Sequence, residues 1–351
     1  MNLPVQPPVS PMLAKLHTAI PEGEGWLYEP KWDGFRAIVF RDGAGLEIGS
    51  RDKRPLQRYF PELLPVLCDV LPEQCVVDGE IIIAGPEGLE FDTLQLRLHP
   101  AESRVRKLAG EIPASFVAFD LLALGSQDLM KTPFGERRAL LERELAGVSA
   151  ATFDFLTHVR RLDPCVLLTP QTSDVAEARR WYTDLESIKL EGLVVKRTDQ
   201  LYCPGDRTMI KIKHRRTVDC VVGGYRRQRT GDGLGALLLG LYDDGGVLHY
   251  VGHTSSFSRA EGRDVLEMLK PLEGGDSFGF GRTPGGLSRW SAGKGETDWV
   301  NVTAQLVCEV SFDYLQGARF RHAARFERWR DDKPPTECTW DQLKVTPPKY
   351  R

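Results

Sequence analysis

The sequence lacks a long apolar run, a paired cysteine motif and an overall excess of basic charge. None of its 351 residues lie in an apolar stretch of about 18 residues, so no transmembrane helix is expected. The proline-rich start lacks the basic-then-apolar pattern of a signal peptide. Its 7 cysteines include no Cys-x-x-Cys pair, which argues against a disulfide framework and a structural zinc site. We therefore expect a cytoplasmic protein that does not bind membranes.

The formal net charge of −3 gives no overall attraction to a polyanion, but the charge is unevenly distributed. Basic side chains gather in two clusters, and clusters of this kind are most often only solvated surfaces. The first comprises Arg207, Lys211, Lys213, Arg215, Arg216, Arg226, Arg227 and Arg229, and the second Arg319, Arg321, Arg325, Arg328, Arg330 and Lys333. Because both adjoin candidate phosphate-binding motifs, they suggest a nucleic-acid partner.

The chain contains two successive regions that differ in their pattern of expected secondary structure. Up to about Lys213, strands mix with helices at irregular spacing, which predicts a mixed α/β domain rather than a doubly wound one. Beyond that point, short strands separated by Gly and Asp turns predict a small β-barrel. A chain of this length favours two or three domains, at about 150 residues per domain.

Hydrophobic periodicity places the expected elements. In the first region the expected strands are 26–28, 35–40, 46–48, 75–83, 116–122, 192–196 and 209–213, and the expected helices are 58–71, 134–145 and 175–188. In the second region we expect strands 218–225, 236–242, 247–251 and 306–312, a helix 259–269 and a long exposed loop 274–295.

The most informative segment is 29–36, Glu-Pro-Lys-Trp-Asp-Gly-Phe-Arg. It places Lys31 close to Glu29 and before an Asp-Gly turn. An amine attacks only in its neutral form, so a nucleophilic lysine needs burial or cationic neighbours. By itself the segment fits equally well a surface lysine that precedes a hairpin turn.

Two glutamates adjoin glycines at apolar strands. Glu80 follows Gly79 within a strand pattern, and Glu191 precedes Gly192 and another strand. Such carboxylates suit a divalent cation that also binds nucleotide phosphates, because magnesium prefers oxygen ligands. Taken singly, each is equally well an ordinary acid at a turn.

Two further strands carry groups of chemical interest. Residues 209–213 alternate, which puts Lys211 and Lys213 on one face. Two ammonium groups there would bind a phosphate and disfavour the charged form of a nearby lysine, although a solvated strand face is the simpler interpretation. Phe119, followed by Asp120, is either a core residue or a ring that stacks on a purine.

In this order the segments resemble the motifs of the covalent nucleotidyltransferase superfamily, which contains ATP-dependent DNA ligases, RNA ligases and mRNA capping enzymes. The matching segments are Lys-x-Asp-Gly-x-Arg at 31–36, Ser50-Arg51, Asp78-Gly79-Glu80, Phe119-Asp120, 191–196, Lys211-x-Lys213, and Arg330-Asp331-Asp332-Lys333, which resembles the tail motif of the ligases' OB domain. Each motif is common alone, but the ordered set from about residue 26 to residue 333 is specific. Length and tail most resemble small stand-alone bacterial DNA ligases and the ligase domains of bacterial end-joining enzymes. Asp206 departs from the usually basic run before Lys211.

The resemblance implies an α+β fold, with a mixed-sheet nucleotidyltransferase (adenylation) domain at 1–213 and an OB-fold β-barrel at 214–351. It implies that Lys31 takes AMP from ATP, with Mg²⁺ or Mn²⁺, and that the AMP then activates the 5′-phosphate of a DNA nick. The implied catalytic residues are Lys31, Lys211 and Lys213; the nucleotide-binding residues are Glu29, Arg36, Arg51, Glu80, Phe119, Lys196, Arg330, Asp332 and Lys333; the metal ligands are Glu191 and Glu80. Because the tail lies on a separate barrel, we expect the barrel to close on the nucleotide and then to swing away.

The implied partner is nicked double-stranded DNA, bound by a monomer that works with repair or end-joining proteins. Two alternatives with the same chemistry stay open, an RNA ligase and a capping guanylyltransferase, and the tail motif disfavours most RNA ligases. An alternative of another class is a non-catalytic nucleic-acid-binding protein, which covalent AMP on the chain would exclude.

Overall fold

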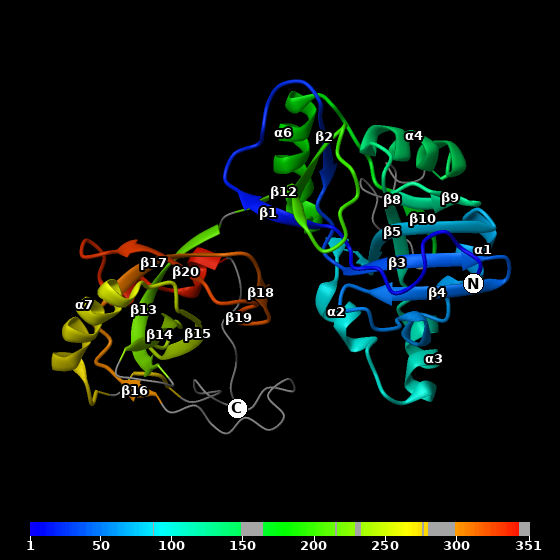
Figure 1. Ribbon diagram of the computed structural model, residues 1–351. Coiled ribbons are helices and arrows are strands. Elements are labelled where there is room, and N and C mark those ends of the chain that lie inside the picture. Colours follow the sequence, from blue (N-terminus) through cyan, green and yellow to red (C-terminus); the bar gives the residue numbers. More distant parts are fainter. Residues whose placement is uncertain are drawn as a thin grey trace. The chain divides into compact units, whose positions relative to one another are not determined.

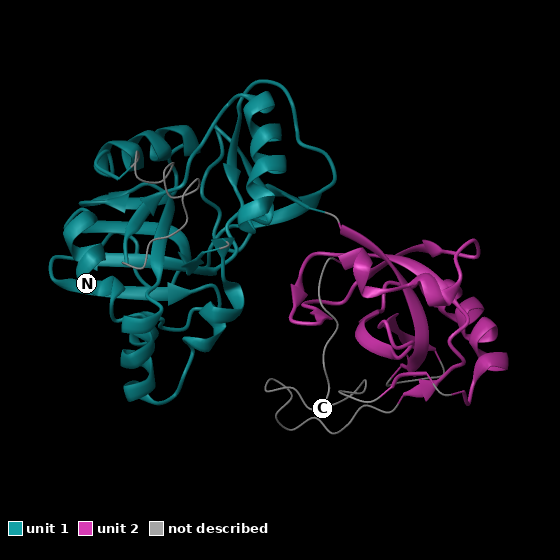
Figure 2. Cartoon of the chain, turned by 180° about the vertical axis from the view of Figure 1, so that it is seen from behind, with its two compact units in different colours: residues 1–214 teal, residues 215–351 magenta. Residues whose placement is uncertain are grey.

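A computed structural model describes residues 1–86, 88–148, 164–214, 216–228, 233–275, 277–279 and 299–343. The chain forms two compact units, Met1–His214 and Arg215–Arg351 (Figure 2). Within those residues, no helix has both the length and the apolar surface to span a bilayer. All 7 cysteines are unpaired thiols, as the sequence predicted.

The first unit contains a mixed six-stranded sheet (Figure 1). Its strands, in spatial order, are β10 (Val166–Leu168), β8 (Ser115–Leu124), β5 (Gln74–Ile82), β3 (Phe35–Asp42) and β4 (Gly45–Ser50), with β9 (Gln127–Asp128) paired to β8. Only β10 and β8 run parallel, and the other pairs are antiparallel. Side chains alternate between two apolar layers, since Ala37 and Val39 of β3 join one core cluster and Ile38 and Phe40 join another. This sheet is therefore buried on both faces.

The first unit contains several short helices beside this sheet. They are η1 (Gln57–Tyr59), α1 (Leu63–Val70), α2 (Phe91–Leu96), α3 (Glu102–Glu111) and α4 (Phe134–Glu144). Of these, α1, α2 and α4 contribute buried residues to one of its apolar layers. Leu67 of α1 and Leu141 of α4 are buried in the same cluster as Val39. The expected continuous helix over 58–71 is wrong. The chain leaves the helical conformation at Phe60, because a residue that precedes a proline, here Pro61, disfavours helical backbone angles.

A four-stranded sheet completes the first unit. Its strands, in spatial order, are β1 (Leu13–His17), β12 (Arg207–Lys213), β11 (Gly192–Arg197) and β2 (Trp26–Pro30), with β1 parallel to β12 and the rest antiparallel. Helix α6 (Val175–Asp184) packs on it through Ala178, and η2 (Leu185–Ile188) follows. Asp174 caps α6 by accepting a hydrogen bond from the backbone N–H of Ala176, at 2.8 Å. The short strands β6 (Ala84–Gly85) and β7 (Gly88–Leu89) pair antiparallel.

The connection between β2 and β3 crosses from the four-stranded to the six-stranded sheet, so it is not a hairpin turn. Gly34 is needed here because the backbone passes close to β5, and not because the chain reverses direction. A Cβ at this position would lie 2.2 Å from the carbonyl oxygen of Ile81 in β5, and no side chain fits at that distance. The crossover therefore fixes Lys31 where the two sheets meet.

The second unit is a curled antiparallel sheet with one apolar core, which confirms the expected β-barrel. Its strands, in spatial order, are β15 (Leu248–Thr254), β14 (Leu234–Tyr242), β13 (Arg216–Arg227), β17 (Val307–Phe312) and β20 (Arg325–Trp329), with β16 (Val300–Asn301) paired to β13. The edges β15 and β20 approach each other where the N–H of Ala324 donates to the carbonyl of His253, at 2.9 Å. The remaining elements are α7 (Arg259–Leu269), η3 (Lys270–Leu272), β18 (Leu315–Gln316), β19 (Arg319–Phe320), η4 (Pro335–Glu337) and η5 (Trp340–Leu343).

The helix expected over 259–269 has those bounds. A capping box explains its start, because Ser258 accepts from the backbone N–H of Glu261 and the Glu261 side chain accepts from the backbone of Ser258. Of the expected loop 274–295, residues 276 and 280–295 lie outside the described residues.

Candidate active site

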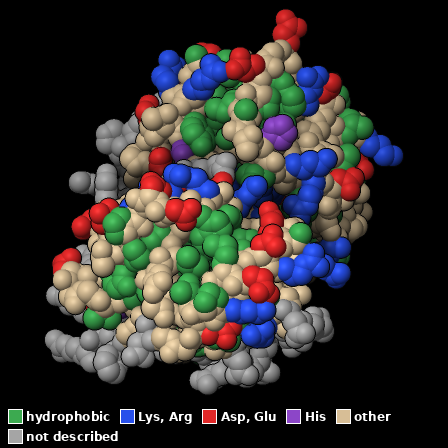
Figure 3. Space-filling view, turned by 90° about the vertical axis from the view of Figure 1, so that its left-hand side faces the viewer, with side chains coloured by type: hydrophobic (Ala, Val, Ile, Leu, Met, Phe, Trp, Pro, Cys, Tyr) green, Lys and Arg blue, Asp and Glu red, His purple; other side chains and the backbone are tan. Residues whose placement is uncertain are grey.

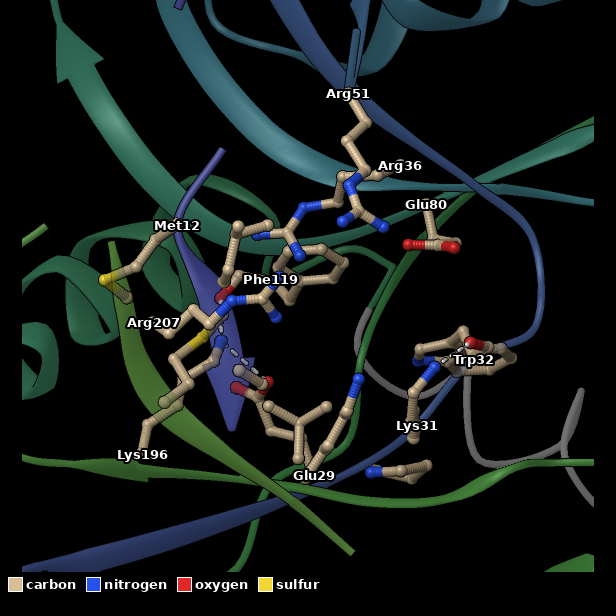
Figure 4. Close-up of a pocket in the computed structure, with 16 residues that line it drawn as sticks. Met12, Glu29, Lys31, Trp32, Arg36, Arg51, Glu80, Phe119, Lys196 and Arg207 are labelled. Carbon is tan, nitrogen blue, oxygen red and sulfur yellow. Dashed lines mark hydrogen bonds and ion pairs between the residues drawn. The ribbon is translucent and has the colours of Figure 1, made fainter. Parts of the chain in front are cut away.

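A pocket opens between the two sheets of the first unit (Figure 4). It encloses about 830 Å³ when the solvent at its open mouth is counted. The four-stranded sheet and its flanks contribute Met12, Leu13, Ala14, Glu29, Pro30, Lys31, Trp32, Val194, Lys196, Arg207, Met209 and Lys211, and the six-stranded sheet and its flanks contribute Arg36, Arg51, Glu80 and Phe119. Cationic side chains thus line a cleft of the size that nucleotides and other small ligands occupy.

Lys31 and Glu191 are held together by both side chain and backbone. Their side chains form an ion pair, and Lys213 Nζ donates to Glu191 Oε1 at 3.2 Å. The backbone N–H of Lys31 donates to the carbonyl of Gly192 (2.8 Å), and that of Glu191 donates to the carbonyl of Lys31 (2.9 Å). Gly192 has a φ of +130°, and a Cβ there would lie 2.0 Å from the carbonyl oxygen of Ile212. Glycine is thus required where the two motifs meet.

Near Lys31, the charge of Glu191 is neutralised by two lysines, whereas the charge of Lys211 is not neutralised by any described carboxylate. Burial alone would raise the pKa of Glu191, but Lys31 and Lys213 outweigh it, so this pKa lies below its ordinary value. Lys211 also faces the pocket, and no carboxylate among the described residues pairs with it. Burial, assisted by Lys213 and Lys31, lowers the pKa of Lys211. An anion that enters the pocket therefore meets an ammonium group that no described carboxylate neutralises.

Glu80 on β5 faces the same space from the other sheet. No hydrogen bond or ion pair from any described residue reaches its carboxylate. Burial raises the pKa of Glu80 to about 7, although Lys31 and Arg36 act in the opposite direction. No three His, Cys, Asp or Glu side chains of the described chain gather as a metal site, so Glu80 and Glu191 do not form a complete ligand set by themselves.

The opposite end of the pocket is aromatic and contains a buried carboxylate. Glu29, 2% exposed, accepts from Lys196 Nζ at 2.7 Å and from Gln171 Nε2 at 2.9 Å, and Arg138 Nη1 lies 3.6 Å away. The ring of Phe119 lies beside this group, with Lys196 Nζ 5.0 Å from its centroid. The structure therefore places Lys196 next to Glu29 and Phe119, at the end opposite Lys31 (Figure 4).

Arg36 joins this wall through a fixed ion pair. Its Nε and Nη2 each donate to Asp78, both at 2.6 Å, and the Tyr202 hydroxyl also donates to Asp78 at 2.6 Å. Burial alone would lower the pKa of Arg36, but Asp78 outweighs it and raises the pKa, so the guanidinium stays charged. It lies 4.5 Å from the centroid of Phe119. Figure 4 shows Arg36, Arg51 and Arg207 pointing toward the same region beside that ring.

Several residues that support the site received no role from the sequence. Asp120 and Arg137 form a buried bidentate pair behind Phe119, with 2.8 and 2.9 Å between donors and acceptors. The available signal was an acid within the apolar run 116–124, since a buried carboxylate needs a cationic partner. The sequence does not reveal the partner, which comes from α4. The other residues missed are Met12, Trp32, Asp78, Arg138, Gln171 and Tyr202.

The tail motif belongs to the second unit and forms a network of its own. Arg330 Nη1 donates to both carboxylate oxygens of Asp219, at 2.8 and 2.9 Å, and Lys333 Nζ donates to Asp219 Oδ2 at 2.9 Å. Arg330 also donates to Asp332 through Nε (2.8 Å) and Nη2 (3.0 Å). These hydrogen bonds lower the pKa of Asp332 to about 2. The motif's cations are thus already oriented by two carboxylates.

Both units match known families. Residues 11–213 match the family described as the ATP dependent DNA ligase domain, and residues 230–333 match the ATP dependent DNA ligase C terminal region. The chain belongs to the ATP-dependent DNA ligases. A nucleotidyltransferase domain followed by an OB-fold domain, as the sequence predicted, is the architecture of this family. The RNA ligase, capping enzyme and non-catalytic alternatives are therefore set aside.

The ligase has both full-length and partial relatives. It is 50% identical to DNA ligase C of Mycobacterium tuberculosis over 98% of this chain and 96% of the relative. It is 30% identical to the multifunctional non-homologous end joining DNA repair protein LigD of the same species, over 94% of this chain but only 39% of that protein. A solved structure from a structure–function analysis of Lig E DNA ligases shares the fold, with a TM-score of 0.54 at 18% identity, covering 92% of this chain and 99% of that one.

The two basic clusters of the ligase are largely engaged by their own chain. Lys213, Arg328, Arg330 and Lys333 bind carboxylates, and Arg216 Nη1 donates to the carbonyl of Asp313 at 2.7 Å. On the face that Figure 3 presents, Lys and Arg side chains alternate with Asp and Glu side chains. Arg226 differs, because its Nε is buried without a hydrogen-bond partner among the described residues. Arg215 and Arg229 lie outside the described residues.

Proposed function

We propose that this DNA ligase seals nicks in double-stranded DNA by way of AMP carried on Lys31. One observation carries the proposal: Lys31, which is ion-paired with Glu191, lies at one end of a pocket whose other end holds Phe119 and Glu29, and Lys213 binds the same Glu191. A nucleotide needs this order of groups, with cations near its phosphates and a flat apolar surface near its base.

In the first step the Nζ of Lys31 attacks the α-phosphorus of ATP in line. The ammonium of Lys31 first loses a proton to solvent, and the neutral amine then attacks; the nitrogen–phosphorus bond forms, the nitrogen loses a second proton to solvent, the bond to the bridging oxygen breaks, and pyrophosphate leaves with the electron pair. Lys211 and Lys213 hold the charge of the α-phosphate, and the ion pair with Glu191 keeps the Lys31 side chain in place. Phosphoryl transfer of this kind depends mainly on positioning and charge neutralisation, which are the properties of these side chains.

The remaining pocket residues hold the rest of the nucleotide. Phe119 stacks on adenine, and Glu29 contacts the base edge. Lys196 acts through Glu29, because the ammonium lies 2.7 Å from that carboxylate and not beside Lys31. The side chains that contact the ribose and phosphates are Arg36, Arg51 and Glu80.

A divalent cation, Mg²⁺ or Mn²⁺, fits the carboxylates of Glu191 and Glu80. Magnesium is commonly held by one or two carboxylates together with substrate phosphates and water. Glu80 and Glu191 interact electrostatically, and the described residues supply no third His, Cys, Asp or Glu to this pair, which agrees with that pattern. Such a cation, when bound, neutralises part of the phosphate charge.

Residues 1–213 form the adenylation domain in this proposal, and residues 214–351 form the OB-fold domain. Arg330, Asp332 and Lys333 orient the departing pyrophosphate and act in the first step only. The two units must therefore change their relative position before the AMP passes to the 5′-phosphate of the nick. The 3′-hydroxyl then attacks that phosphate, the strand is joined and AMP leaves. We place this reaction in the cytoplasm, in DNA repair or end joining, with a monomeric enzyme.

Product formation on defined nicks tests the proposal. Duplexes with one nick, made of DNA or of RNA, are incubated with magnesium and either ATP or GTP, and joined strands are separated on a denaturing gel. We expect joining of the DNA nick with ATP at a rate far above that of the other combinations. Preferential joining of the RNA nick, or a preference for GTP, would contradict it.

A further inference from the structure

The acid that holds the tail motif lies outside that motif. Asp219 is on β13, whereas Arg330 and Lys333 follow β20. The side chains are mostly buried, with exposed fractions of 11% for Asp219, 19% for Arg330 and 17% for Lys333. One carboxylate therefore fixes two cations that are more than a hundred residues away in the sequence.

Asp219 is itself held on both sides of its backbone. Its N–H donates to Gln342 Oε1 at 3.1 Å, and its carbonyl accepts from Gln342 Nε2 at 3.1 Å. Gln342 lies on η5 next to Trp340, which is 2% exposed and anchors this turn in the barrel core. The carboxylate thus projects from a rigid support, as an orienting group requires.

The neighbouring strand offers a contrast. Asp219 is opposite Glu309 of β17 in the antiparallel pair, and like charges directly opposite each other destabilise a sheet. Glu309 is compensated by Arg328, which is 58% exposed, at 2.7 Å. Asp219 instead binds the two cations of the tail motif. Asp219 and Glu309 thus lie opposite each other on neighbouring strands, but only Asp219 binds the tail motif.

The network leaves donors available for a phosphate. Asp219 and Asp332 balance the charges of Arg330 and Lys333 one for one. The ammonium of Lys333 has three N–H groups, and the described acceptors are Asp219 (2.9 Å) and Gln342 (3.4 Å). The guanidinium has five N–H groups and a fixed plane, so its remaining donors point in a defined direction.

We propose that Asp219 is a positioning residue for the pyrophosphate-releasing step, which it serves by orienting Arg330 and Lys333. This rests on the proposed role of the tail in the first step. Without the carboxylate, both side chains must be ordered each time ATP binds, at a cost in rate. Steps that do not involve pyrophosphate do not need this orientation.

The test compares Asp219→Asn with Glu309→Gln, which removes the opposite acid on the same sheet. Three rates are measured: transfer of labelled AMP from ATP to the enzyme, release of AMP from the adenylated enzyme by added pyrophosphate, and joining of a nick that already carries AMP. We expect Asp219→Asn to slow the two pyrophosphate-dependent reactions at least about tenfold, equivalent to about 1.4 kcal/mol of activation free energy. Joining of the pre-adenylated nick stays near the wild-type rate, and Glu309→Gln changes none of the three.

Thermal unfolding of each variant is recorded alongside. Should Asp219→Asn prove unstable, Asp219→Glu keeps the charge and is expected to retain part of the pyrophosphate-dependent rate. Equal slowing of all three reactions, or a normal rate of AMP transfer, would overturn the inference. Lys333→Ala distinguishes the role of Asp219 from the proposed role of the tail motif in the first step. Slow AMP transfer in Lys333→Ala with a normal rate in Asp219→Asn removes only the inference, whereas a normal rate in Lys333→Ala removes the role of the tail as well.

Discussion

Lys31 and Glu191 flank the neighbouring strands β2 and β11, and they are joined by an ion pair and by the hydrogen bond from the backbone N–H of Glu191 to the carbonyl of Lys31. The proposed nucleophile is thus oriented before any nucleotide is present. Because Gly192 admits no Cβ at this point, the backbone also fixes the distance between the two motifs.

Removing the charge of Glu191 tests the value of that orientation. Glu191→Gln keeps the shape of the side chain but weakens its hold on Lys31 and Lys213. We expect AMP transfer from ATP to fall about a hundredfold, since a small displacement of a reacting group can cost that much. Glu111→Gln, which alters an acid with 56% exposure, is the matched control and should react normally. An unchanged rate in Glu191→Gln would remove this residue from the mechanism.

The pKa of Glu80 predicts a pH dependence of stability. The pKa rises from 4.5 to about 7 on folding, so the folded state binds the proton more tightly. The resulting stability is fully present below pH 4.5 and is lost as the pH rises through about 7. Glu80→Gln cannot ionise and therefore avoids this loss. Above pH 7 its free energy of unfolding should exceed that of the wild type by at most about 3 kcal/mol, since a tenfold change in proton affinity corresponds to about 1.4 kcal/mol. Urea unfolding at pH 4.5 and 8 measures it, and the same difference between variant and wild type at both values would refute it.

The ion pair behind Phe119 should be important for stability. Arg137 is fully buried, and its pair with Asp120 is shielded from water. Arg137→Ala leaves a buried carboxylate without its bidentate cationic partner, which should cost about 3–5 kcal/mol of unfolding free energy. Arg106→Ala breaks an ion pair whose side chains are both 75% exposed, and should cost less than about 1 kcal/mol. Similar denaturation midpoints for the two variants would contradict this assignment.

Nick binding should weaken steeply as salt concentration rises, because basic side chains on the ligase displace counterions from DNA. Each phosphate contact contributes about 0.9 to the slope of log affinity against log salt concentration. Arg226 belongs to the first basic cluster and forms no ion pair with a described carboxylate, so it should contribute about one such contact. Arg328 is bound to Glu309 and should contribute less. Fluorescence anisotropy on Arg226→Ala and Arg328→Ala measures both slopes; a flat response in the wild-type enzyme would rule out the electrostatic account.

Most of the fold was predictable where the sequence is periodic. Strand 35–40, observed as Phe35–Asp42, and helix 259–269 lie where expected, because a short apolar run and a capping box are local signals. Pro61 was a local signal that the helix expected over 58–71 is interrupted, but the apolar periodicity across it concealed that signal. Strand β1 was missed because its pairing with β12 is a long-range contact that no local pattern records.

The candidate site was predictable in its residue types but not in its pairings. Residues as distant as Lys31 and Glu191 were both identified, since each belongs to a recognisable motif. The sequence did not show that Lys196 binds Glu29, or that Asp219 binds Arg330. Both depend on which strands become neighbours, a property of the whole sheet rather than of any segment.

The most direct test of the account is covalent labelling of the chain. The protein is incubated with magnesium and ATP labelled at the α-phosphate, then denatured and separated, with Lys31→Ala and the exposed Lys15→Ala compared under the same conditions. We predict label on the wild type and on Lys15→Ala, and none on Lys31→Ala. Label that persists in Lys31→Ala, or its absence from the wild type, would contradict the proposed lysyl-AMP intermediate.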